Sequence, residues 1–149
     1  MSRKLVSAAL FCLLLLFSNL CALAEPMMRA DIEQFDAGEG KVTKRFCNTE
    51  QIQSEVSQWL TKDVQLAPES KIDVKQGLIF KIPLQPPVQV QKLNITVSEL
   101  FVIVNTGPQL RMLVLDHNRP FLLILNRDKT STFFSLLKER PEMHNNPSL

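Results

Sequence analysis

The sequence predicts an α+β domain, in which an antiparallel β-meander of three to five strands is packed by an amphipathic helix and followed by a short C-terminal helix. Three apolar runs, residues 100–104, 110–115 and 121–125, are joined by turns of about four residues. Parallel strands need a crossover of a dozen or more residues, so these three strands must run antiparallel. With 149 residues, 45% apolar and 21% charged, the chain has the size and composition of one globular domain.

We expect four segments along the chain. Residues 1–24 form a signal peptide, residues 25–40 an N-terminal segment that is partly ordered, residues 41–140 the single α+β domain, and residues 141–149 a flexible tail. The apolar residues Met28, Ile32 and Phe35 fall at helical spacing and predict a short helix within the second segment. Residues 41–46 follow as a short extended segment.

The first 24 residues contain the three parts of a secretory signal peptide. Arg3 and Lys4 give a positive start, residues 5–17 are apolar, and Ala22-Leu23-Ala24 is a small-x-small cleavage pattern. We expect cleavage after Ala24 and export to the cell envelope or the extracellular space, with no membrane span left in the mature chain. The alternative is an uncleaved anchor, for which residues 5–24 are just long enough.

Cleavage also changes the charge of the protein. The full chain carries 17 basic and 15 acidic residues, and removal of Arg3 and Lys4 makes the two numbers equal. A mature chain with zero formal net charge gives no electrostatic reason to expect binding to nucleic acid or to an anionic membrane. It also offers little charge repulsion against self-association.

The clearest helix covers residues 48–60. Asn48 is expected to cap its first turn, with Gln51 three residues later completing a capping box. Its apolar residues recur with the period of one helix face. They are Ile52, Val56, Trp59 and Leu60.

The middle of the chain combines extended patterns with prolines. Residues 72–75 alternate, and residues 78–84 predict a strand that Pro83 confines to a sheet edge. Residues 88–97 fit either a strand or a loop. Residues 131–140 predict the C-terminal helix, capped by Asp128 or Thr130.

The three meander strands are apolar on both faces, whereas an antiparallel sheet usually buries only one. If both predicted helices cover the same face, the other needs the N-terminal segment, a second copy of the chain or another protein; cover by the chain's own helices is the alternative. The candidate interaction surface consists of Phe101, Ile103, Leu113, Leu115, Leu122 and Ile124. The strand at residues 78–84 offers a second route, by strand addition to its edge.

Cys47 is the only cysteine that remains after cleavage, and it is a candidate reactive or bridging thiol. Lys44, Arg45 and the start of the predicted helix lie beside it, and such surroundings lower the pKa of a thiol. The mature histidines, His117 and His144, lie in a turn and in the tail, so no Cys-His catalytic arrangement is indicated. We expect no catalytic residues, no metal site and no cofactor.

The sequence therefore predicts an exported, non-catalytic interaction module that binds a protein partner or associates with itself. A small exported thiol-dependent enzyme or redox protein using Cys47 is one alternative. Another is a carrier that holds an apolar small molecule between the sheet and the helix at residues 48–60. The Asn94-Ile95-Thr96 triplet is a glycosylation sequon if the secretory route is eukaryotic.

Overall fold

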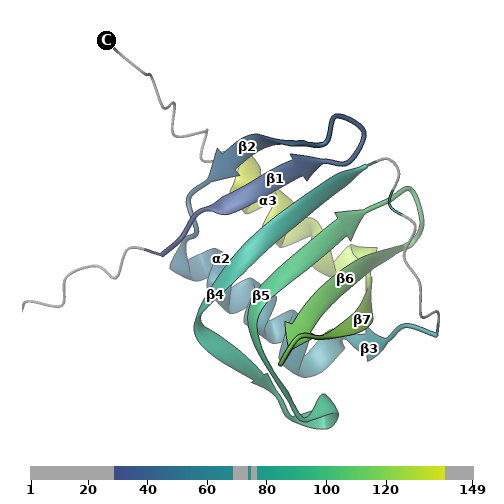
Figure 1. The fold of residues 1–149 in the computed structure, drawn as a ribbon. Helices are drawn as coiled ribbons and strands as arrows, with labels where there is room; N and C mark the ends of the chain where they lie inside the picture. Colours follow the sequence, from purple (N-terminus) through teal and green to yellow (C-terminus); the bar gives the residue numbers. More distant parts are fainter. Residues whose placement is uncertain (1–28, 69–73, 75–76, 140–149) are drawn as a thin grey trace, which may run out of the picture.

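The computed structural model describes residues 29–68, 74 and 77–139 (Figure 1). The signal peptide and the C-terminal tail predicted from the sequence lie outside these residues, as does most of the alternating segment at residues 72–75. In chain order the elements are β1 (Ile32–Asp36), β2 (Lys41–Phe46), α2 (Glu50–Gln58), the π-helical turn η1 (Trp59–Asp63), β3 (Gln65–Leu66), β4 (Leu78–Val90), the 3-10 turn η2 (Gln91–Leu93), β5 (Ile95–Val104), β6 (Gln109–Asp116), β7 (Arg119–Asn126), the 3-10 turn η3 (Arg127–Thr130) and α3 (Ser131–Glu139).

The strands form one seven-stranded sheet in the order β2-β1-β4-β5-β6-β7-β3, with antiparallel pairing throughout. The α+β class and the β5–β6–β7 meander are therefore confirmed. The expected three to five strands are too few, because β1, β2 and the two-residue β3 extend the sheet at its edges. The turn between β6 and β7 is a tight hairpin, in which His117 and Asn118 both have positive φ, at 48° and 62°.

The segment expected to form a short N-terminal helix is strand β1. It pairs with β2 on one side and with β4 on the other, so the sheet satisfies its backbone groups on both edges. The turn that follows favours this hairpin. The Asp36 carboxylate accepts hydrogen bonds from the Gly38 and Glu39 amides at 2.8 and 3.1 Å, and Gly40 has a φ of 68°.

Strand β4 lies in the interior of the sheet, between β1 and β5, so the prediction of an edge strand at residues 78–84 is wrong. Pro83 is tolerated there because both ladders are interrupted near it. The pairing with β1 ends at Lys81, and the register with β5 shifts between Pro83 and Val88. The segment at residues 88–97 proves to be the end of β4, the turn η2 and the start of β5.

Helix α2 begins one residue later than the sequence indicates. Thr49, not Asn48, is the N-cap, and its hydroxyl accepts a hydrogen bond from the Ile52 amide at 3.3 Å. Gln51 is therefore not in the third helical position, and the expected capping box does not form. The apolar stripe is as predicted, since all four of its residues are buried: Ile52, Val56, Trp59 and Leu60.

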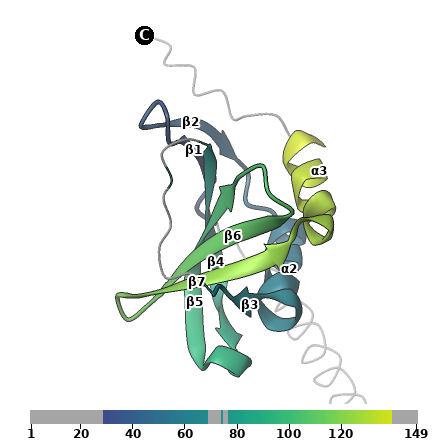
Figure 2. The ribbon, with the colours of Figure 1, turned by 90° about the vertical axis from the view of Figure 1, so that its right-hand side faces the viewer.

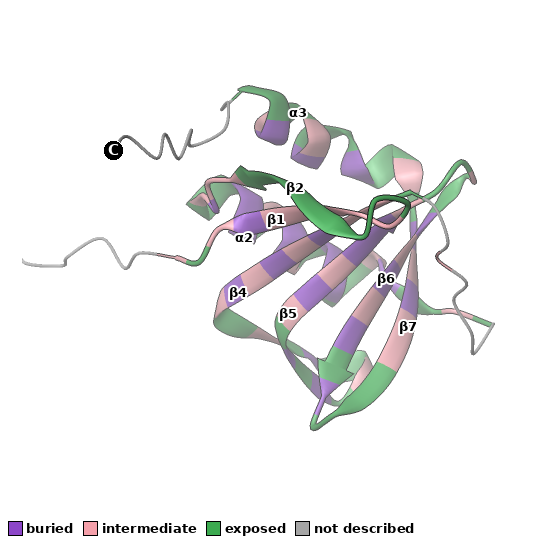
Figure 3. Cartoon of the chain, turned by 45° about the horizontal axis from the view of Figure 1, so that its top comes forward, coloured by how far each residue is buried: buried purple, intermediate pink, exposed green. Residues whose placement is uncertain are grey.

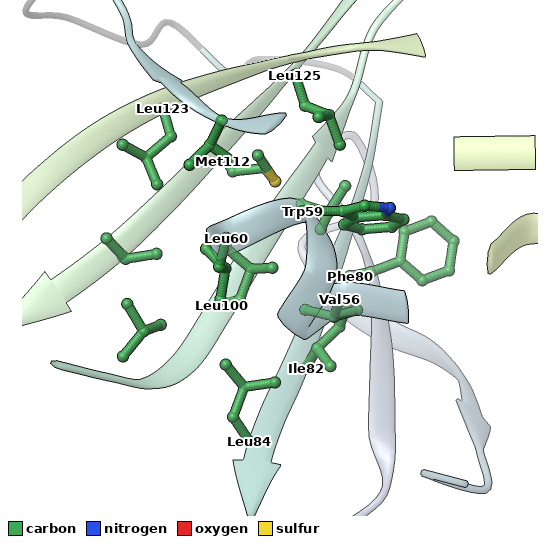
Figure 4. Packing of buried hydrophobic residues seen from close by; sticks show 14 of the residues in the cluster. Val56, Trp59, Leu60, Phe80, Ile82, Leu84, Leu100, Met112, Leu123 and Leu125 are labelled. Atoms are coloured by element: carbon green, nitrogen blue, oxygen red, sulfur yellow. The ribbon is translucent and has the colours of Figure 1, made fainter. Parts of the chain in front are cut away.

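Both helices pack on the same face of the sheet (Figure 2). The Trp59 indole of η1 meets the Phe133 ring of α3 edge-on, with 5.2 Å between ring centroids, and Phe133 also meets Phe80 of β4 at 6.1 Å. Figure 4 shows Leu60 among the side chains of the central strands. Each such side chain stabilises the fold by about 1.5–3 kcal/mol when fully buried, so this one face holds the core of the domain.

Candidate functional site

We call the sheet surface that faces away from α2 and α3 the outer face. The pairing register gathers the predicted interaction residues on it, because directly opposed residues of neighbouring strands point to the same side. Phe101 of β5 lies opposite Leu113 of β6, which lies opposite Leu122 of β7. The remaining predicted residues belong to the same surface: Ile103, Leu115 and Ile124.

These six residues differ in how far they are exposed. Leu115 is 45% exposed, whereas Phe101, Leu113, Leu122 and Ile124 are half-buried. Ile103 is only 7% exposed and is therefore not available as a contact residue. Along β4 to β7, buried positions of the inner face alternate with half-buried positions of the outer face (Figure 3). Five of the six predicted residues therefore form a partly accessible apolar surface.

Ion pairs border this apolar surface on the side of β1 and β2. Lys81 of β4 pairs with Glu99 of β5 at 3.3 Å, and Arg45 of β2 pairs with Glu33 of β1 at 3.2 Å. Each pair is formed between neighbouring strands and carries no net charge. Because exposed pairs contribute at most about 1 kcal/mol, they set the polarity of the border more than the stability of the fold.

A cluster of side-chain amides, which sequence reasoning did not anticipate, joins α2 to β4. The Asn48 amide nitrogen donates to the carbonyl oxygens of Ala30 and Pro83, at 3.0 and 2.8 Å. The Gln53 side-chain nitrogen donates to Asn48 Oδ1 at 2.5 Å and to the Pro83 carbonyl at 2.8 Å. Gln53 Oε1 accepts a hydrogen bond from the backbone N–H of Gln85 at 2.9 Å. We call Asn48, Gln53 and the backbone of Pro83 and Gln85 the amide clamp.

The amide clamp replaces ladder hydrogen bonds where β4 bends. Asn48 and Gln53 are each 8% exposed, so their polar groups need protein partners, and the clamp supplies them. The helical period of α2 placed Gln53 on a polar side, and nothing in the sequence pattern distinguishes it from the exposed Gln51 and Gln58. A cavity of about 250 Å³ lies beside the clamp, between α2 and the β4 bend.

Cys47 lies between β2 and α2, where it is half-buried and not disulfide-bonded. Arg45, one of its predicted activating cations, is paired with Glu33. His117 lies in the β6–β7 turn, and the four strand spacings from β2 to β6 correspond to about 19 Å. The structure therefore does not bring Cys47 and His117 together, and His144 lies outside the described residues.

His117 belongs instead to a small charged cluster around Asp116. Its Nδ1 lies 3.1 Å from Asp116 Oδ1, and the Arg119 guanidinium lies 3.6 Å from Oδ2. The hydrogen bond from His117 lowers the pKa of the Asp116 carboxyl; burial opposes this shift, while the hydrogen bond from the Thr96 amide and the Arg119 guanidinium act in the same direction as His117. Asp116 is 6% exposed, so this cluster fixes the end of the β6–β7 hairpin.

Comparison with known proteins assigns no family to the chain. No protein-family model, no curated protein and no solved structure matches it. Within residues 29–68, 74 and 77–139, no helix is both long and apolar enough to cross a membrane. The same residues contain no group of three or more His, Cys, Asp or Glu side chains placed to hold a metal ion.

Proposed function

We propose that the chain is an exported, non-catalytic interaction module whose outer sheet face packs against a second copy of itself. The supporting observation is that α2 and α3 lie on one face of the sheet, while the outer face keeps five apolar side chains partly accessible. Contiguous apolar surface of this kind is characteristic of interaction sites.

The balanced charge of the mature chain supports a second copy as the partner of the outer face. The mature chain has equal numbers of basic and acidic residues, so two copies approach without net repulsion. The bordering pairs, Lys81–Glu99 and Glu33–Arg45, are already neutral within one copy. In a self-complementary contact of two such faces, the charges of these border pairs therefore keep their partners.

The expected affinity follows from the size of the surface. Four strands spaced about 4.8 Å apart, with about eight residues at 3.3 Å each, present roughly 500 Å². Two copies would bury roughly 1,000 Å² in total, which is the lower limit for a specific protein interface. We therefore expect a dimer that dissociates on dilution rather than an obligate one.

The test is the native mass of mature protein starting at Glu25, measured by light scattering over a concentration series, with and without reductant. Leu115→Lys places a like charge on both copies in the contact and should weaken the dimer at least about tenfold. Leu66→Lys is the matched control, because Leu66 is 53% exposed and pairs with the inner-face residue Leu123. It should leave the dimer unchanged.

Three results would contradict the proposal. One is a monomer mass at every concentration. Another is an equal effect of Leu115→Lys and Leu66→Lys. The third is a dimer that reductant abolishes, because that would assign the association to a Cys47 bridge.

A further inference from the structure

The cavity beside the amide clamp is lined by opposite charges that do not pair with each other. Arg29, which precedes β1, and Glu50, in the first turn of α2, both line it. The Arg29 Nε donates to the Gln85 carbonyl at 3.5 Å. Among the described residues, neither the terminal nitrogens of Arg29 nor the Glu50 carboxylate has a hydrogen bond or an ion pair.

The Gln85 side chain gives a second, independent indication of a ligand. Its Oε1 is buried and has no hydrogen-bond donor in the described part of the chain, although Gln85 lines the cavity. Buried polar atoms in folded proteins almost always have a partner. Because the last side-chain torsion of glutamine has a broad energy profile, the amide group of Gln85 can reorient at the cavity wall to reach a ligand.

The amide clamp makes the floor of the cavity rigid but not reactive. Both ends of the Gln53 amide are engaged, with Asn48, Pro83 and Gln85, so Gln53 shapes the site and is not itself a free ligand group. Pro87 and Val88 add an apolar wall opposite α2. The charged and amide groups that remain for a ligand are therefore those of Arg29, Glu50 and Gln85, and the hydroxyl groups of Ser54 and Ser57 lie beside them.

We propose that this cavity binds a small zwitterion of the size of a free amino acid, with its carboxylate on Arg29 and its ammonium on Glu50 and Gln85 Oε1. A simple anion would pair with Arg29 alone and a simple cation with Glu50 alone, whereas a ligand that carries both charges pairs with both groups. A volume of about 250 Å³ is smaller than the usual pocket for a drug-sized molecule, about 300–1,000 Å³.

This inference is independent of the proposed self-association. It is tested on the mature protein by titration with free glycine, alanine, valine and proline, with acetate and methylammonium as single-charge probes. The side-chain amide NMR signals of Gln53 and Gln85 report on the floor and wall of the cavity. We expect saturable shifts with the zwitterions, and at least about tenfold weaker binding of either single-charge probe.

Arg29→Gln and Glu50→Gln should each weaken zwitterion binding at least about tenfold. Glu139→Gln, at an exposed position of α3, is the matched control for Glu50→Gln and should leave binding unchanged. Glu50 is also exposed, so Glu50→Gln should fold. This variant still tests the proposal if Arg29→Gln does not fold. The proposal is overturned if none of the four amino acids gives a saturable shift, or if Glu50→Gln binds them as well as the unmodified protein.

Discussion

Replacing Gln53 with Ala tests whether the amide clamp holds α2 to the sheet. The substitution removes three hydrogen bonds, to Asn48 Oδ1, to the Pro83 carbonyl and from the Gln85 amide. Pro83 keeps a donor, because the Asn48 amide nitrogen also reaches its carbonyl at 2.8 Å. Asn48 Oδ1 and the Gln85 N–H are the two groups that lose their partner.

The expected destabilisation follows from these two groups. A buried polar group without a partner costs about 1–3 kcal/mol, so the two together cost about 2–6 kcal/mol. Water entering from the adjacent cavity lowers this cost, and the higher helix propensity of Ala offsets a few tenths of a kcal/mol. We therefore expect Gln53→Ala to reduce the free energy of unfolding by about 2–4 kcal/mol. That is a large share of the 5–15 kcal/mol typical of a domain.

Urea unfolding measures the effect, with the fluorescence of the single Trp59 as the probe. Trp59 is 2% exposed and packs on Phe133, so its emission reports directly on the contact between the helices. For a urea m-value of about 1–2 kcal/mol/M, the midpoint should fall by about 1–4 M.

Gln51→Ala is the matched control for this experiment. It makes the same substitution in the same helix at an exposed position, where changes stay within about 0.5 kcal/mol. Gln53→Met retains the length of the side chain without its hydrogen bonds, and should still destabilise the protein. Equal midpoint shifts for Gln53→Ala and Gln51→Ala, or an unchanged midpoint for Gln53→Met, would show that the amide clamp does not hold α2 to the sheet.

Two further predictions concern the ends of elements. Thr49→Ala removes the N-cap of α2 and should cost about 1 kcal/mol in urea unfolding, whereas Thr49→Ser should cost much less; equal losses would contradict the cap assignment. Asp116→Asn should lower stability at neutral pH and cease to matter in acid. Because folding lowers the pKa of Asp116, its contribution is present above its unfolded pKa of about 3.9 and is lost as the pH falls through the lower folded value. Thermal unfolding from pH 7 downward measures this, and a difference that does not shrink in acid would refute it.

The elements that the sequence predicts well are those with local signals. The meander follows from apolar runs and turns too short for a crossover, and the α2 stripe follows from one helical period. The predicted N-cap, Asn48, is one residue before the observed one, because Asn and Thr are both good N-cap residues. Only the docking of α2 on the sheet decides between Asn48 and Thr49.

The misassigned elements depend on partners distant in the sequence. Ile32 and Phe35 are three residues apart, which fits a helix, but pairing with β2 and β4 makes this segment a strand. Pro83 favours an edge position, but it is tolerated in a central strand because both ladders are interrupted near it, and there Asn48 and Gln53 hydrogen-bond its carbonyl instead. Local sequence patterns reveal neither relation, because β4 is more than 40 residues from β1 and the partners of Pro83 are 35 and 30 residues away.

The two candidate sites also differ in how far local sequence patterns predict them. That both faces of the meander are apolar can be read along the chain, and the register then collects Phe101, Leu113 and Leu122 on the outer face. The burial of Ile103 could not be predicted, because its strand pattern is the same as that of its neighbours. The cavity joins Arg29 to Gln85, which are 56 positions apart, and no local motif marks it.

The two proposed sites lie on opposite sides of the sheet, so a variant in one site can be tested without disturbing the other. The cavity is lined by α2, which covers the inner face, whereas the proposed dimer contact uses the outer face. Leu115→Lys should therefore weaken self-association without changing zwitterion binding, and Glu50→Gln should do the reverse. Substitutions at sites without shared partners act independently, so a variant that altered both properties would indicate a change in the fold rather than loss of either site.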